Sequence, residues 1–245
     1  MVLSDKHKYV FIELPFTAST AISRELRECY DGRKILVKHA NYTQFLMGAN
    51  QEQKQYFSFS GVRNPLDEAV SRFLKLKSNP QTVYEEPWVT PQIRRRYKWV
   101  SENDRSFSDY FFRYFRFPFE NWASLDHKRM DYVYRLENVV DEFDTILRRI
   151  GIEPLRSLPV RHKTAGKAPW KEYYPPHTRS RAAFVFGPFM NRWGYSFPEE
   201  WGIQGVPQNA EIIYRGKVVT KNAARRLLAM RRSRRRMNSA GSVQR

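Results

Sequence analysis

The residues best suited to chemistry form a small turn between a predicted strand and a predicted helix. The turn Pro15-Phe16-Thr17-Ala18-Ser19-Thr20-Ala21 follows a β-branched and aromatic run at residues 8–13. Backbone N–H groups and the positive end of the helix dipole would converge here, which favours a bound anion such as phosphate. The alternative is that Thr17 or Ser19 only caps the helix. The motif G-x-x-x-x-G-K-[ST] is missing, so an ordinary nucleoside-triphosphate P-loop is disfavoured.

A second motif, Arg63-Asn64-Pro65, follows another apolar run at residues 56–62, and Ser71 lies eight residues after Arg63. A guanidinium group offers paired donors that match phosphate oxygens, and a serine two helical turns further on can add a hydroxyl. Taken alone, an arginine before a turn is more often solvated or salt-bridged. After a strand and before a helix, in a chain that also carries the first turn, the motif predicts a second phosphate contact.

Together the two motifs resemble those of the sulfotransferases that use 3′-phosphoadenosine 5′-phosphosulfate, particularly the carbohydrate-modifying 2-O-sulfotransferase branch. In that family a P-K-T-[AG]-[ST]-[ST] turn holds the 5′-phosphosulfate, and R-[DN]-P with a later serine binds the 3′-phosphate. The resemblance implies that residues 15–21 bind the 5′ end of the donor and that Arg63 and Ser71 bind its 3′-phosphate. Residues 134–137 (YRLE) and 193–197 (WGYSF) also look like later segments of the family.

The family resemblance extends to a late basic loop, which in the family covers the 3′-phosphate and the adenine. Arg161, Lys163 and Thr164 occupy the corresponding place here, although a solvated basic loop would have the same composition. One position departs from the family pattern, because Phe16 stands where the family usually has a lysine that stabilises the phosphate leaving group. We expect another cation to supply that charge, with Lys38 as the nearest candidate and Arg161 or Lys163 as others.

His39 is the candidate general base. Transfer of a sulfuryl group to an alcohol requires removal of the hydroxyl proton, and imidazole is suited to this at neutral pH. The related 2-O-sulfotransferases have a histidine after their second strand, and His39 looks similar in position. The alternatives are a surface histidine with no catalytic role, or Glu13 as the base, since some sulfotransferases use a glutamate. The chemistry requires no metal.

The elements that must position these residues alternate between strand and helix. We expect strands at residues 8–13, 35–37, 56–62 and 131–135, and helices at 21–30, after Pro65, and at 91–100, 107–115, 140–150 and 177–190. This alternation predicts an α/β fold with a central parallel sheet in a three-layer sandwich. The resemblance implies the P-loop NTPase-like sulfotransferase fold. We expect one domain over residues 1–207, followed by a basic tail over residues 208–245.

Composition and charge restrict the class of protein further. The 245 residues carry a net charge of +18, and the tail alone holds eleven Lys and Arg against one acid. No run approaches the roughly 20 apolar residues of a membrane span, and no secretory signal is evident. A lone Cys29 excludes an internal disulfide, so a cytoplasmic protein is expected. The tail is predicted to be flexible or helical, and it could contact an anionic membrane surface or nucleic acid.

These observations predict a sulfotransferase that moves a sulfuryl group from 3′-phosphoadenosine 5′-phosphosulfate to a hydroxyl, releasing adenosine 3′,5′-bisphosphate. By resemblance the acceptor is a carbohydrate, either a glycan or a glycolipid. Aromatic and basic residues between Tyr84 and Trp122 could line its cleft, although most such aromatics are core residues. Two alternatives stay open, a nucleotide-dependent phosphotransferase of related fold and a non-catalytic binder of polyanions or nucleic acid. The sequence does not determine the oligomeric state.

Overall fold

The structure is a computed structural model that describes residues 1–78, 84, 86, 89–159 and 167–241, with the backbone alone at 122–123, 225–226 and 228–241. The chain divides into two compact units. Unit 1 contains Met1–Arg63, Glu120–Arg161 and Arg215–Arg245, and unit 2 contains Asn64–Phe119 and His162–Tyr214. Residues 1–207, predicted as one domain, therefore contribute to both units.

Unit 1 is built on a five-stranded sheet with the strand order β3-β1-β2-β4-β5. β2 pairs parallel with β4, and β4 pairs parallel with β5, whereas β1 lies antiparallel between β2 and β3. The predicted α/β class with a mostly parallel central sheet is confirmed. The strands are β1 (Val2–Ser4), β2 (Tyr9–Phe11), β3 (Arg33–Lys34), β4 (Phe57–Val62) and β5 (Tyr132–Arg135).

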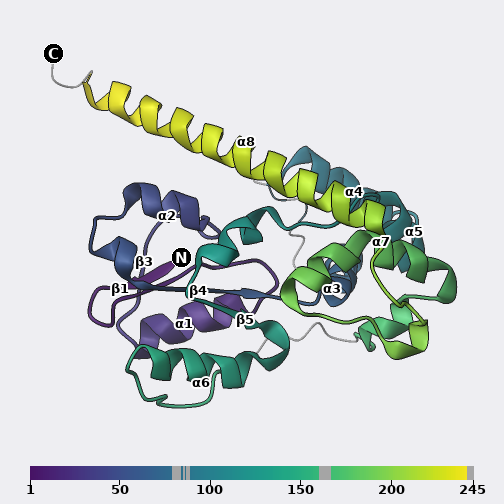
Figure 1. The fold of residues 1–245 in the computed structure, drawn as a ribbon, viewed down its shortest axis with the longest axis horizontal. Helices are drawn as coiled ribbons and strands as arrows, with labels where there is room; N and C mark the ends of the chain where they lie inside the picture. Colours follow the sequence, from purple (N-terminus) through teal and green to yellow (C-terminus); the bar gives the residue numbers. More distant parts are fainter. Residues whose placement is uncertain (79–83, 85, 87–88, 160–166, 242–245) are drawn as a thin grey trace. The chain divides into compact units, whose positions relative to one another are not determined.

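Helices cover both faces of this sheet because successive residues of its strands point to opposite sides. Tyr9 and Phe11 of β2 pack with helices α1 (Ser19–Cys29) and α6 (Val139–Arg149). Val10 of the same strand packs on the other face with α2 (Tyr42–Gly48). Figure 1 shows α1 and α6 on one side of the sheet and α2 on the other. The arrangement is compatible with the predicted three-layer sandwich.

The prediction of a second strand at residues 35–37 is wrong. The strand comes earlier, at Arg33–Lys34, and it pairs with β1, a strand that the sequence analysis did not predict. Leu36 then adopts a left-handed φ of 55°, and the Val37 side chain is 73% exposed. A short apolar run has no period that could distinguish a strand from the turn after one. Because β2 and β3 both run antiparallel to β1, they are parallel to each other, and their carboxyl ends point in the same direction.

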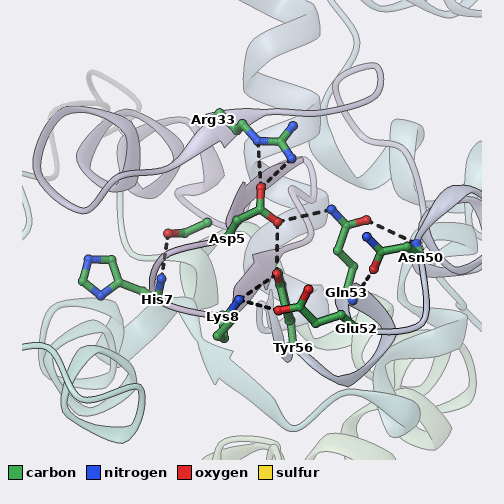
Figure 2. Close-up of polar contacts among 9 residues, drawn as sticks. Asp5, His7, Lys8, Arg33, Asn50, Glu52, Gln53 and Tyr56 are labelled. Atoms are coloured by element: carbon green, nitrogen blue, oxygen red, sulfur yellow. Dashed lines mark hydrogen bonds and ion pairs between the residues drawn. The ribbon is translucent and has the colours of Figure 1, made fainter.

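A polar network closes the opposite end of this sheet (Figure 2). In the loop between β1 and β2, Asp5 accepts hydrogen bonds from Arg33 Nη2 at 2.7 Å, from Gln53 Nε2 at 3.2 Å and from the Tyr56 hydroxyl at 3.1 Å. The hydrogen bonds from Arg33 and Gln53 lower the pKa of Asp5. Lys8 also bonds to Tyr56. These bonds join β3 and the segment before β4 to the loop between β1 and β2.

Unit 2 is helical around an aromatic core. Phe107, Phe111, Tyr174 and Phe186 are buried there in mutual ring contacts. The helices expected after Pro65 and near residues 91–100, 107–115 and 177–190 are confirmed. They are α3 (Pro65–Ser78), α4 (Pro91–Ser101), α5 (Phe107–Tyr114) and α7 (Pro176–Trp193).

The predicted basic tail forms one continuous helix, α8 (Gln208–Gly241), drawn in yellow in Figure 1. Among the described residues, no helix has the length and apolar character needed to cross a membrane. Short 3₁₀ helices complete the chain at Gln53–Gln55, Trp122–Arg129, Leu136–Asn138, Trp170–Tyr173 and Glu199–Trp201.

Substitutions at two glycines, Gly61 and Gly48, test the packing of the sheet. A Cβ atom added to Gly61 of β4 would lie 2.3 Å from the ring of Tyr134, which crosses that strand. We expect Gly61→Ala to lower the free energy of unfolding by about 1–3 kcal/mol, the usual cost of overpacking a core. The matched control is Gly48→Ala at the end of α2, where nothing lies within 4 Å of the added atom. Urea unfolding that gives both variants the same loss would contradict this packing.

Candidate functional site

The turn between β2 and α1 is held by its own hydroxyl groups. Thr17 Oγ1 and Ser19 Oγ both donate to the carbonyl oxygen of Leu14, at 3.1 and 2.6 Å. The N-cap residue of α1 is Ala18, and no side chain caps this helix. The alternative that Thr17 or Ser19 serves only as a helix cap is therefore wrong. Both hydroxyls shape the turn, and the first turn of α1 keeps its N–H groups without a side-chain cap.

Two residues of this turn have backbone conformations that are unusual for side chains with a Cβ atom. Phe16 has a φ of 66° and Ala18 a φ of 56°. Such left-handed conformations cost roughly 1–2 kcal/mol per residue, so the surrounding structure must enforce them. Backbone N–H groups around left-handed residues can point into one concavity, which is a common way to hold an anion. The left-handed conformations of Phe16 and Ala18 are features that the sequence analysis did not predict.

The side chain of Tyr134 on β5 makes a hydrogen bond to the turn, a role that the sequence analysis did not assign. Its hydroxyl donates to the carbonyl oxygen of Thr17 at 2.8 Å. The side chain is fully buried, and this burial raises the pKa of Tyr134, so the hydroxyl stays protonated and able to donate. Gly61 makes room for the ring. A glycine within a predicted strand was the available signal, because it often marks the close approach of another group.

Arg63 connects the second motif to the first. Its Nη1 atom donates to the carbonyl oxygen of Phe16 at 3.3 Å, so the guanidinium group lies at the turn. The rest of the motif begins unit 2. There the Asn64 side chain accepts the Leu66 N–H at 2.9 Å, and Pro65 is the first residue of α3. Asparagine as a cap and proline in the first turn are standard ways to begin a helix.

His39 lies close to the carboxyl end of β2, where it contacts Glu13. This agrees with the parallel directions of β2 and β3, because His39 comes after the carboxyl end of β3. Its Nδ1 atom is 3.2 Å from the carbonyl oxygen of Glu13. Because a carbonyl oxygen can only accept, Nδ1 must carry the hydrogen, and Nε2 of the neutral ring keeps its lone pair. Partial burial of the ring lowers the pKa of His39, although the residue as a whole is exposed. The bond to Glu13 opposes this shift, and the charge of Lys38 acts in the same direction as burial. The imidazole is therefore neutral at pH 7 and can accept a proton.

Lys38 reaches the N-terminal turn of α1 from the same segment. Its Nζ atom donates to Thr20 Oγ1 at 3.4 Å, a long and weak hydrogen bond that still places the ammonium group beside the turn. Phe16 contributes no charge at this place. Lys38, from the segment that follows β3, thus places a positive charge beside the turn.

Glu13, the alternative base, is buried and already has hydrogen-bond partners within the protein. It is 4% exposed, and its carboxylate pairs with the amino group of Met1. Burial alone would raise the pKa of Glu13, but the bond to Met1, a hydrogen bond with Ser23 and the charge of Lys38 together lower it. A carboxylate with these partners is less suited than the Nε2 atom of His39 to accept a proton from a substrate.

Ser71 belongs to unit 2, where it is buried on α3. Lys167 Nζ donates to Ser71 Oγ at 3.1 Å and also pairs with the carboxylate of Asp67, one helical turn before Ser71. Lys167 is a cation that the sequence analysis missed, because nothing in its own sequence context distinguishes it from other loop lysines. The predicted contacts at Arg161, Lys163 and Thr164 lie outside the described residues.

A groove with a volume of about 620 Å³ lies on unit 2, within the region predicted to line an acceptor cleft. The Arg113 guanidinium lies 4.7 Å from the ring centroid of Trp99, and Trp99 meets Tyr114 edge to face at 5.6 Å. Tyr84 of the same region is buried in the core, and Tyr97, Trp99 and Tyr114 pack against that core. The groove is lined by Trp99, Asp109, Phe112, Arg113, Tyr114 and Arg116.

Comparisons with protein-family models, with curated proteins and with solved structures found no match to this chain.

The ionisation of His39 gives a direct test of this geometry. We expect an NMR titration of the imidazole to give a midpoint below its ordinary value of 6.5. The unfolded chain protonates His39 at a higher pH than the folded protein does. The free energy of unfolding should therefore decrease as the pH falls from 6.5 to the pKa of His39 in the folded protein. Lys38→Met should raise the midpoint by removing a neighbouring positive charge.

The control is Lys34→Met, at an exposed lysine of β3. This variant should leave the midpoint of His39 unchanged. A midpoint at or above 6.5, or equal responses to the two lysine variants, would show that His39 does not lie where the structure places it.

Proposed function

We propose that this protein is a sulfotransferase that transfers a sulfuryl group from 3′-phosphoadenosine 5′-phosphosulfate to a hydroxyl of a carbohydrate. The observation that carries the proposal is the meeting of three separate segments in unit 1. Arg63 bonds to Phe16 of the turn, Lys38 bonds to Thr20, and His39 bonds to the end of β2. The proposal includes the P-loop-like sulfotransferase fold, with which the mostly parallel sheet and its helices are compatible.

In this proposal the turn binds the 5′ end of the donor. The uncapped N–H groups of α1, together with the left-handed residues Phe16 and Ala18, offer donors to the phosphosulfate. Arg63 contacts the 3′-phosphate, as the resemblance implies. Ser71 is assigned to the same phosphate by resemblance, and its bond to Lys167 adds a cation within unit 2. The donor phosphate would compete with Asp67 for that lysine.

The proposed reaction is an in-line displacement at sulfur. A bond forms from the acceptor oxygen to sulfur while the bond from sulfur to the bridging phosphate oxygen breaks. The proton of the acceptor hydroxyl passes to Nε2 of His39, and adenosine 3′,5′-bisphosphate leaves with the negative charge. Lys38 stabilises that charge in place of the lysine that Phe16 replaces, because a fixed cation beside a developing anion lowers the barrier. No covalent enzyme intermediate is needed.

The groove of unit 2 supports a carbohydrate as the acceptor class, either a glycan or a glycolipid. Aromatic rings can pack against sugar rings, and a guanidinium group can bind an acidic substituent. Arg113 and Trp99 provide both features within one groove. A panel of neutral and acidic glycans, tested with a labelled sulfate donor, would identify the acceptor.

Donor identity can be tested without an acceptor. Adenosine 3′,5′-bisphosphate should raise the melting temperature, because a ligand at 100 times its Kd adds about 2.7 kcal/mol to the state that it binds. Adenosine 5′-monophosphate should raise it much less, because it lacks the 3′-phosphate. Arg63→Ala should remove most of this difference, whereas Arg24→Ala, at an exposed arginine of α1, should preserve it.

Two outcomes of this thermal-shift experiment would contradict the proposal. If ATP stabilised the protein more than the bisphosphate, the phosphotransferase alternative would be favoured. If no nucleotide changed the melting temperature, the fold would lack a donor site, and the alternative of a non-catalytic polyanion binder would gain support.

The proposed role of His39 predicts that its replacement changes the turnover rate but not the affinity for the nucleotide. His39→Ala should lower turnover by roughly 10²–10⁴-fold, the usual effect of losing a general base. The affinity for adenosine 3′,5′-bisphosphate should stay the same, because the proposed contact is with the acceptor hydroxyl. Near-normal turnover in a folded His39→Ala protein would exclude His39, and Glu13→Gln would then test the alternative base.

A further inference from the structure

The helix α8 presents apolar side chains to solvent on one face. Val219 is 68% exposed and Leu227 is 56% exposed, and Ala223 between them is exposed as well. These residues lie four positions apart, so they form one stripe along the helix. Arg215, four positions before Val219, is exposed and charged, so the apolar side chains begin at Val219. We call residues 219, 223 and 227 the apolar stripe.

The opposite face of α8 carries lysines that are less exposed than the stripe. Two positions along an α-helix rotate the side chain by about 200°, so Lys217 and Lys221 point away from Val219. Lys221 Nζ donates to the carbonyl oxygen of Glu120 at 2.9 Å. Burial lowers the pKa of both lysines. Between residues 217 and 227, the helix thus turns Lys217 and Lys221 inward and leaves the apolar stripe exposed.

The charge of the same helix restricts what can cover the stripe. Residues 208–245 contain eleven Lys and Arg and one acid, Glu211, and seven of the arginines lie between positions 225 and 236. A second copy of this helix would bring two strongly basic segments together, and like charges repel. Nucleic acid would satisfy the arginines, but it offers no apolar surface for Val219 and Leu227. An anionic lipid surface satisfies both, because its headgroups are negative and its acyl chains are apolar.

We propose that α8 is a membrane-surface helix that lies on anionic lipid, with the apolar stripe at the boundary between headgroups and acyl chains. The arginine-rich part at residues 225–236 would bind the phosphate and carboxylate groups of the lipids. The helix lies along the surface and does not cross it, in agreement with its lack of a spanning apolar segment among the described residues. This inference does not depend on the proposed sulfotransferase activity.

Vesicle binding by the full-length protein tests the proposal. We expect binding to vesicles of phosphatidylcholine mixed with phosphatidylserine, weak binding to phosphatidylcholine alone, and a loss of binding at high salt. The double variant V219N/L227N removes two apolar contacts without changing the charge. It should weaken binding to the mixed vesicles by at least about tenfold, because each buried aliphatic side chain contributes more than 1 kcal/mol.

The matched control is T220N/A224N, which places the same two asparagines at exposed positions beside the stripe. It should bind like the wild type, and circular dichroism should show equal helix content in both double variants. Equal vesicle binding by V219N/L227N and the control would overturn the proposal. So would tight binding to single-stranded DNA or heparin without vesicle binding, or a wild-type dimer that V219N/L227N converts to a monomer.

Discussion

The hydrogen bond from Tyr134 to the carbonyl oxygen of Thr17 is the interaction on which the candidate site depends most directly. It joins β5 to the turn between β2 and α1, and the ring that carries the hydroxyl fits only because Gly61 of β4 has no side chain. Without it, a buried carbonyl would lose its partner, at a cost of about 1–3 kcal/mol. This contact and the two hydroxyl bonds to Leu14 hold the left-handed residues of the turn in place.

Much of this architecture follows from the sequence alone. A β-branched and aromatic run at residues 8–13 and an apolar run at residues 56–62 predict strands, and the helix at residues 139–149 has one apolar face. These elements are found close to where they are expected. The position of the turn was also predictable, because small hydroxyl residues stand between a predicted strand and a predicted helix. Arg63 was identified from its place after a strand, and the structure gives it a bond to the turn.

Other features could not be predicted because they depend on partners that are distant in sequence. The strand β1 has only three residues, and it is stable because it pairs on both sides with β2 and β3. The run at residues 35–37 looked more like a strand than Arg33–Lys34, yet β1 pairs with the latter. In the same way, Lys167 gains significance only from its contact with Ser71, almost a hundred positions earlier in the chain. Pairing of this kind leaves no local pattern in either segment.

The replacement of the usual lysine by Phe16 has a physical consequence for the proposed chemistry. A lysine within the turn would be fixed by the turn itself, whereas Lys38 comes from a separate segment after β3. Hydrogen bonds from Lys38 to Thr20 and between His39 and Glu13 join that segment to the turn and to the end of β2. The cation and the base then lie on adjacent residues. Their charges are coupled, because Lys38 contributes to the lowered pKa of His39. The same ammonium group that would stabilise the leaving phosphate therefore also helps to keep the imidazole neutral and ready to accept the proton.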